Sequence, residues 1–256
     1  MKSRIVIAVT LLSGFLLCSC GSTFSSSNPG ATIRDGNWSI QTVSSATGAT
    51  LNMGATLMQS GNTVTGTLLD PSYVGCSDPL IGPQSIPLTG AFQNDALTMT
   101  SPSYSLTLKG TGTGTYISGT SSNAGDCPQS ALNGNLSGTY IPSISGNWTS
   151  TFVLNGQTVT LTVDLTQGNT VNDAGYLPLT GMATLSGSSC FEGGNSSPTV
   201  SYISGNNMSF GVGTSGVIFS LTGKISNSSA TTIDGNFWFP STVCGGQTGT
   251  IQLTKQ

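Results

Sequence analysis

Six cysteines carry most of the reactive chemistry in this sequence, which contains no histidine. Without histidine, the Ser-His-Asp and Cys-His arrangements of nucleophilic catalysis and His-ligated metal sites are excluded. The thiols do not form CxxC pairs, so the spacing of a zinc site is absent as well. Covalent modification and disulfide formation are therefore the chemistry expected of them. The cysteines are Cys18, Cys20, Cys76, Cys127, Cys190 and Cys244.

Carboxylates are the second group that could do chemistry, and the relevant ones fall in segments expected to be long loops. Such a set could line the mouth of a site for a small ligand or a cation. The spacing is not that of an EF-hand, however, and solvated loop acids are the favoured interpretation. Hydrolysis of glycosides by paired carboxylates is the least favoured function, and no lysine lies in an SxxK motif. We expect no enzyme, no metal and no cofactor. The acids are Asp70, Asp78, Asp126 and Glu192.

The N-terminus predicts export from the cytoplasm. Lys2 and Arg4 precede an apolar run from Ile5 to Leu17. As a helix this run would rise only about 20 Å, which is too short for a hydrocarbon core of roughly 30 Å. The run is therefore interpreted as the apolar region of a signal peptide.

The end of that run resembles the lipobox of bacterial lipoproteins, through the residues Leu17-Cys18-Ser19-Cys20. The resemblance implies that residues 1–19 are a signal peptide and that Cys20 becomes the lipid-modified first residue, carrying diacylglyceryl and palmitate chains. It also implies a cell-envelope protein anchored to a membrane. Gly21 stands where inner-membrane retention would call for Asp, which favours the outer membrane. The alternatives are ordinary signal-peptide cleavage with a free Cys20, or a buried N-terminal strand.

Composition favours a folded chain that is preceded by a flexible linker, or leash. Residues 20–35 are rich in Ser and Gly and are expected to form a flexible linker. Charged residues make up 6% of the whole sequence, and nothing basic clusters, so a nucleic-acid partner is not expected. The membrane, reached through the lipid, is the partner that the sequence predicts.

The remainder of the chain is an internal repeat. Gly36-Asn37-Trp38 recurs as Gly146-Asn147-Trp148. This predicts two duplicated domains, 36–141 and 145–256. Each domain contains two widely spaced cysteines, and the repeat therefore selects the disulfides Cys76–Cys127 and Cys190–Cys244, which suit an exported protein.

Short alternating runs predict strands throughout both halves. Val159, Leu161, Val163 and Leu165 alternate with polar residues, and Asn155-Gly156 just before them is a hairpin signal. In the first half, strands are expected near 36–44, 49–58, 62–69, 86–93, 95–101, 103–109, 113–120 and 134–140. The fold class is therefore all-β, with two tandem antiparallel domains of about eight strands each. Small up-and-down barrels are expected, and β-sandwiches are the alternative.

Each half also resembles the calycin group of lipocalin and avidin-like barrels, through its opening Gly-x-Trp, its meander and its repeated Leu-Thr-Gly strands. The resemblance implies that Trp38 and Trp148 anchor one end of each barrel and that ligands enter at the other end.

Two functions follow from the sequence. The favoured one is a non-catalytic envelope lipoprotein with a structural or interaction role. The alternative is a binder of a small ligand in the barrel mouth. Large inward residues would favour the first, and we expect Met53, Leu57, Tyr104, Phe219 and Leu221 to point inward. Small inward residues would favour the second, and Gly213 and Gly223 fall near the inward register, so the pattern leaves both functions open.

Overall fold

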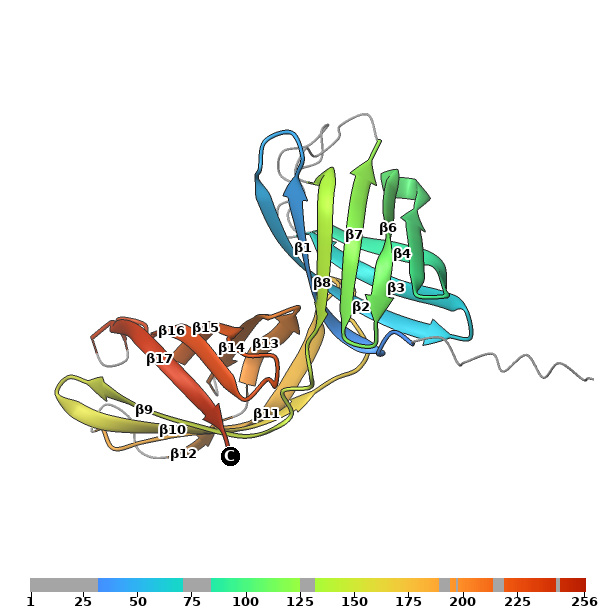
Figure 1. Cartoon of the computed structure of the whole chain (residues 1–256). Helices are drawn as coiled ribbons and strands as arrows, with labels where there is room; N and C mark the ends of the chain where they lie inside the picture. The colour runs from blue at the N-terminus through green and yellow to red at the C-terminus, as the bar shows by residue number, and fades with distance from the viewer. Residues whose placement is uncertain are drawn as a thin grey trace, which may run out of the picture.

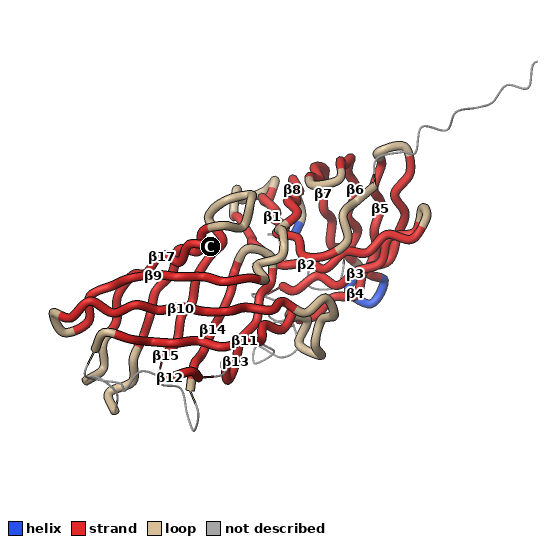
Figure 2. The backbone as a smooth tube through the Cα atoms, turned by 90° about the horizontal axis from the view of Figure 1, so that it is seen from below, coloured by secondary structure: helices blue, strands red, loops and turns tan. Residues whose placement is uncertain are grey.

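The structure is a computed structural model that describes residues 32–70, 84–124, 132–188, 194–196, 198–213, 219–242 and 245–256. It confirms the all-β fold with two antiparallel barrels, which follow one another along the molecule in Figure 2, and it excludes the sandwich alternative. Within the described ranges, no helix has the length and apolar character needed to cross a membrane.

The first barrel is an up-and-down meander of eight strands, which we call barrel 1. Every strand pairs antiparallel with the next, and β1 closes the barrel by pairing with β8 from Trp38↔Tyr140 to Ser44↔Gly134 (Figure 1). The strands are β1 (Gly36–Ser44), β2 (Thr50–Ser60), β3 (Thr63–Asp70), β4 (Gln84–Gln93), β5 (Ala96–Ser101), β6 (Leu106–Thr113), β7 (Tyr116–Asn123) and β8 (Gly134–Tyr140).

The second barrel, barrel 2, has the same meander with one short addition. β10 closes it by pairing with β11, and β12 is a three-residue strand paired to β11. β17 meets β9 at only two residue pairs, Thr254↔Thr149 and Lys255↔Trp148. The strands are β9 (Gly146–Leu154), β10 (Gln157–Gln167), β11 (Leu177–Ser186), β12 (Gly194–Ser196), β13 (Pro198–Ser204), β14 (Asn207–Val212), β15 (Phe219–Ile225), β16 (Thr232–Trp238) and β17 (Thr248–Lys255).

One predicted strand of barrel 1 is displaced. We expected residues 103–109 to be extended with Tyr104 pointing inward, but Pro102–Tyr104 forms a 3-10 turn and β6 begins at Leu106. The proline fixes the φ angle needed for such a turn, and Ser105 then adopts a left-handed φ of 49°. Tyr104 is half-buried and packs against the core from the barrel end.

The middle of barrel 1 is filled by its own side chains. The expected inward residues Met53 and Leu57 are buried, and the remaining cavity among the ten side chains around Leu88 is about 10 Å³. That volume is comparable with the space needed by a single water molecule. In barrel 2, Phe219 and Leu221 are fully buried, as predicted.

The two barrels meet at a close joint. The turn after β13 places Gly205 against the outside of β1 and β2, where Asn37 Nδ2 donates to Gly205 O at 2.7 Å and Gly205 N donates to Asn37 Oδ1 at 2.9 Å. Asn37 is only 2% exposed. A Cβ added to Gly54 would overlap Ser204 Oγ and lie 2.6 Å from the Gly205 nitrogen, so the two backbones touch. This contact fixes one barrel against the other.

Candidate functional site: barrel ends and an outer groove

Most of the site residues predicted from sequence lie outside the described residues. These stay predictions: the lipidation site Cys20, the pairs Cys76–Cys127 and Cys190–Cys244, and the acids Asp78, Asp126 and Glu192. For Asp70, which ends β3, only the backbone is described.

The described strands nevertheless define the two ends of each barrel. In a closed meander the connections β3–β4 and β7–β8 emerge at the same end, and these are the connections that contain Cys76 and Cys127. In barrel 2 the segments after β11 and after β16 likewise leave from one end, and they contain Cys190 and Cys244. The topology is therefore compatible with both predicted disulfides and does not test them.

The opposite end of each barrel holds a buried tryptophan, and both sites are built alike. Trp38 and Trp148 are 0% and 1% exposed. Trp38 Nε1 donates to Arg34 O at 3.0 Å, and Trp148 Nε1 donates to Ile144 O at 2.8 Å, in each case the carbonyl four residues earlier. The preceding glycines have φ angles of 127° and 130°, a backbone conformation that strongly favours glycine. The repeated Gly-Asn-Trp motif thus forms the same plug twice.

A cation covers the aromatic end of each barrel. The Arg34 guanidinium carbon lies 5.4 Å from the ring centroid of Tyr140, and Lys255 Nζ lies 5.7 Å from that of Trp148. Such distances allow an attractive cation–π interaction. Both cations therefore cap the aromatic end of their barrel.

The expected mouth of barrel 1 has a polar interior. Thr42, Ser44, Ser101, Ser121 and Asn123 are all buried there. The Ser121 hydroxyl donates to the Leu132 carbonyl, whereas Ser101 Oγ has no hydrogen-bond partner among the described residues. A buried hydroxyl without a partner costs free energy.

The corresponding end of barrel 2 is closed by an aromatic cluster. The ring centroids of Phe152 and Phe237 are 4.6 Å apart, and those of Phe219 and Phe239 are 5.2 Å apart. All four phenylalanines are buried. The end at which a calycin would admit a ligand is therefore packed with rings in this barrel.

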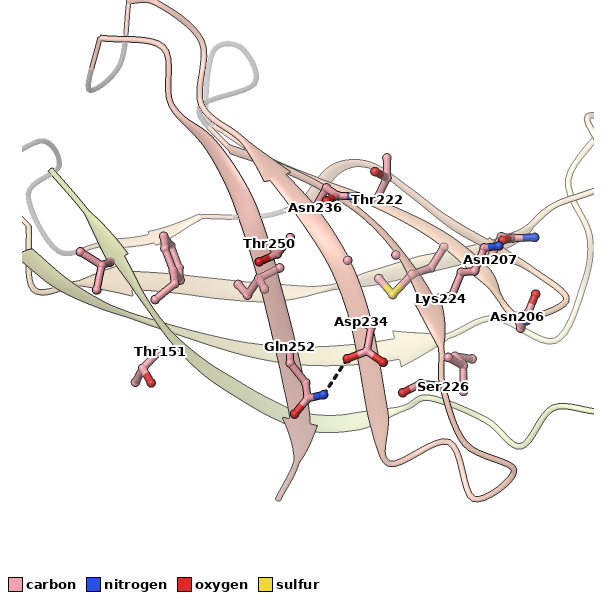
Figure 3. A pocket seen from close by; sticks show the side chains of 17 residues that line it. Thr151, Asn206, Asn207, Thr222, Lys224, Ser226, Asp234, Asn236, Thr250 and Gln252 are labelled. Carbon is pink, nitrogen blue, oxygen red and sulfur yellow. Dashed lines mark hydrogen bonds between the residues drawn. The ribbon is translucent and has the colours of Figure 1, made fainter. Parts of the chain in front are cut away.

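A large hollow lies on barrel 2 and is lined by outward polar side chains together with the buried Phe152, Met208, Ile225 and Ile251 (Figure 3). We call it the outer groove; its volume is about 1010 Å³, and it crosses β9, β17, β16, β15 and β14. Its polar side chains come from outward positions of these strands, among them Thr151, Gln252, Asp234, Lys224 and Asn207. A smaller hollow of about 330 Å³ lies between the barrels, with Gln41 and Asn52 on one side and Asn227 on the other.

One carboxylate is held in a defined position in the outer groove. Gln252 Nε2 donates to Asp234 Oδ1 at 2.6 Å across the β16–β17 pair. Hydrogen bonds from Gln252 and then Ser226 lower the pKa of Asp234 below its ordinary value. Asp234 is therefore ionised at neutral pH, and Lys224 lies opposite it on β15. Across the described part of the chain, no three Cys, Asp or Glu side chains gather as a metal site would need.

Sequence reasoning missed the outer groove. Polar residues at alternate positions, such as Thr222 and Lys224 or Asp234 and Asn236, indicate only a solvated strand face. Whether that face is flat or hollowed depends on how five strands curve together. No local signal in the sequence encodes it.

Comparison with known proteins gives only distant structural likeness. No protein-family model matches the chain, and no curated protein matches it. A protein of unknown function from the DUF3598 family of Nostoc punctiforme is 11% identical, with 89% of this chain and 97% of that chain covered and a TM-score of 0.26.

Two further structures are similar to a comparable extent. The isotype 1 transferrin binding protein B of Neisseria meningitidis is 8% identical over 87% of this chain and 77% of its own, with a TM-score of 0.25. Kievitone hydratase from Nectria haematococca is 9% identical over 89% of this chain and 91% of its own, with a TM-score of 0.23. At these TM-scores the likeness carries no argument about function.

Proposed function

We propose that this chain is a lipid-anchored, non-catalytic component of the bacterial cell envelope that acts through the outer surface of a rigid pair of barrels. The observation that carries the proposal is the filled interior: barrel 1 leaves about 10 Å³ among its central side chains. A pocket for a small molecule needs several hundred cubic ångströms. The barrels thus serve as scaffolds, and the residues on their outer surfaces contact the partners.

The joint between the barrels supports a role in display. Asn37 and Gly205 hold the two scaffolds together with two buried hydrogen bonds. The linker expected over residues 20–35 ends earlier, because Ile33 is buried in barrel 1 and Arg34 N donates to Gly114 O at 3.0 Å. A leash over residues 20–32 would reach at most about 43–47 Å when fully extended. An acylated Cys20 would therefore keep the rigid pair close to the outer membrane while allowing its faces to turn toward partners.

The anchor is tested by metabolic labelling with palmitate in a bacterial host. The wild type is expected to incorporate label and to partition with membranes, and Cys20→Ser is expected to lose both. Cys18→Ser is the matched control, because it changes the neighbouring thiol but keeps Cys20, and it should behave as the wild type. A Cys20→Ser chain that still takes up label and remains with membranes contradicts the proposal.

The filled interior is tested separately. Native mass spectrometry of protein extracted from its host membrane should give the mass of the lipidated chain from Cys20 onward. A small molecule retained at one copy per chain, and lost when Ala55 in the barrel 1 core is enlarged to Leu, would instead indicate a ligand inside the barrel.

A further inference from the structure

The outer groove of barrel 2 runs across the strands instead of along them. Its lining passes from Thr151 on β9 to Gln252 on β17, Asp234 on β16, Lys224 on β15 and Asn207 on β14, as Figure 3 shows. Five strands spaced about 4.8 Å apart span roughly 19 Å. The groove is therefore long and open, a shape suited to an extended ligand.

A pair of glycines lies beneath the middle of the groove. Gly223 and Gly235 lie opposite each other in the β15–β16 pair, and both belong to the lining. A Cβ on Gly235 would lie 2.6 Å from Thr222 O and 2.8 Å from Leu221 Cδ1, so the strands approach closely here. Glycine in the interior of a strand commonly marks such a bend or close approach. Both glycines alternate with outward residues and so occupy inward positions, where the missing Cβ lets β15 and β16 approach each other closely beneath the groove.

The walls of the groove offer uncharged hydrogen-bonding groups. Eight of the seventeen lining residues carry an amide or a hydroxyl, beside five apolar residues, and the side chains of Thr222, Asn236 and Thr250 make no hydrogen bond to another residue in the described part of the chain. Amides and hydroxyls both donate and accept, which matches the hydroxyls of a sugar. Lys224 and Asp234 are the two charged residues of the lining, and their charges offset each other.

An exposed aromatic ring lies on the same face. Trp238 is 45% exposed and follows Asp234 and Asn236 at the next outward position of β16. It is paired with Thr248 on β17 and therefore lies beside the groove. A flat apolar ring next to a row of polar groups suits the C–H faces of a sugar ring, whose hydroxyls point to the sides.

From these features we propose that the outer groove binds a neutral, hydroxyl-rich oligosaccharide chain laid across β14 to β17. The Asp234 carboxylate, held by Gln252, accepts hydrogen bonds from neighbouring hydroxyls. Asn236, Thr222 and Thr250 complete the polar contacts, and Trp238 stacks on a ring at the edge. Since all of these residues lie on paired strands, little side-chain and backbone freedom is lost on binding. The proposal does not depend on the lipid anchor.

Other ligand classes fit the groove less well. A nucleic acid or other polyanion would require several cations, whereas the lining offers Lys224 beside Asp234. A peptide adding as a strand requires an open sheet edge, and β16 at the centre of the groove offers none, because it is paired on both sides, to β15 and to β17. At the end of the groove, however, β17 and β9 pair at only two residue pairs, so a peptide bound there is the competing occupant, and the experiment distinguishes it.

The test measures binding of defined hexasaccharides to the purified full chain in detergent by isothermal titration calorimetry. The probes are cellohexaose, maltohexaose, mannohexaose and chitohexaose. At least one is expected to bind the wild type. Removing one neutral hydrogen-bonding group with Asn236→Ala should weaken that binding about three- to tenfold, and Asp234→Asn should weaken it about tenfold or more. Trp238→Ala should weaken it by a similar factor.

The matched control is Asn135→Ala, which removes an exposed amide from an outward position on β8 of barrel 1. Its affinity should stay within twofold of the wild type. Because Asn236 and Trp238 are exposed, their alanine variants should melt at the wild-type temperature, and Asp234→Asn should lose only the stability that its ionised carboxylate supplies. Failure of all four hexasaccharides to bind overturns the proposal, as does binding that the groove variants leave unchanged. Binding of peptides from digested albumin in place of sugar, lost in Asn236→Ala, would also overturn it and assign the groove to a peptide.

Discussion

Replacing Asn37 by Ala should weaken the joint between the barrels. The substitution removes both partners of Gly205, whose N–H and C=O then remain at a contact where the native side chain is 2% exposed. Each buried backbone group left unsatisfied costs about 1–3 kcal/mol, so the two together cost about 2–6 kcal/mol. Water entering the space left by the amide would bring the result toward the lower end, and we expect a loss of about 2–4 kcal/mol.

The repeat supplies the control for this substitution. Asn147 occupies the same position of the same motif in barrel 2, but its side chain is exposed. Asn147→Ala should therefore change the free energy of unfolding by less than about 0.5 kcal/mol. Both variants remove the same amide from the same local backbone. A difference between their free energies of unfolding therefore measures the contribution of the joint and not that of the strand or the tryptophan plug.

Two measurements decide the outcome. Urea unfolding followed by tryptophan fluorescence gives the free energy of unfolding, and hydrogen exchange gives the opening of the Gly205 amide, which donates to Asn37 Oδ1. In Asn37→Ala that amide should exchange at least about tenfold faster, since a loss of 1.4 kcal/mol corresponds to a factor of ten. Unchanged exchange at Gly205, or equal destabilisation by Asn37→Ala and Asn147→Ala, would refute the reasoning.

Three further predictions concern the joint, the core and the groove. Gly54→Ala should destabilise the chain by about 1–3 kcal/mol, because the new Cβ overlaps Ser204 Oγ and the Gly205 backbone must move; the urea midpoint measures this. Phe152→Ala should cost about 3 kcal/mol by opening a cavity in the phenylalanine cluster, and increased binding of a hydrophobic dye should accompany the loss. The lowered pKa of Asp234 contributes stability that is present above the ordinary carboxylate pKa of about 4 and is lost as the pH falls through the lowered value. Urea midpoints measured between pH 5 and pH 2 should therefore fall less steeply in Asp234→Asn than in the wild type, and parallel curves would contradict the assignment.

The strands of this chain could be predicted because their signal is local. Leu51, Met53 and Leu57 alternate with polar residues and face the core of barrel 1. Asn155 and Gly156 form the expected turn, with left-handed φ angles of 50° and 77°. In each case the pattern and the structure are set by neighbours along the chain or across one hairpin.

The joint and the outer groove could not be predicted, because their causes lie far apart in the sequence. Asn37 and Asn147 have identical neighbours in the motif, yet only Asn37 is buried, by a glycine 168 positions away. The prediction for Tyr104 was wrong for a local reason instead, since the turn at Pro102 replaced the first residues of the expected strand. The shape of the groove depends on how five strands curve together, and the sequence of a single strand does not determine that curvature.

The two Gly-Asn-Trp copies show how a duplicated domain becomes a fixed pair. Both tryptophans form the same plug, so the motif retains its local role in each barrel. The asparagine just before the tryptophan makes an additional contact in only one copy, because the turn at Gly205 has no counterpart packed against Asn147. Two tandem barrels joined by a short linker would otherwise turn freely relative to each other. With Asn37 bonded across the joint, the orientation of the outer groove is set relative to barrel 1, from which the N-terminal leash departs. A ligand in that groove would therefore be held in one orientation to the rest of the molecule, and loosening the joint should change that orientation without changing the groove itself.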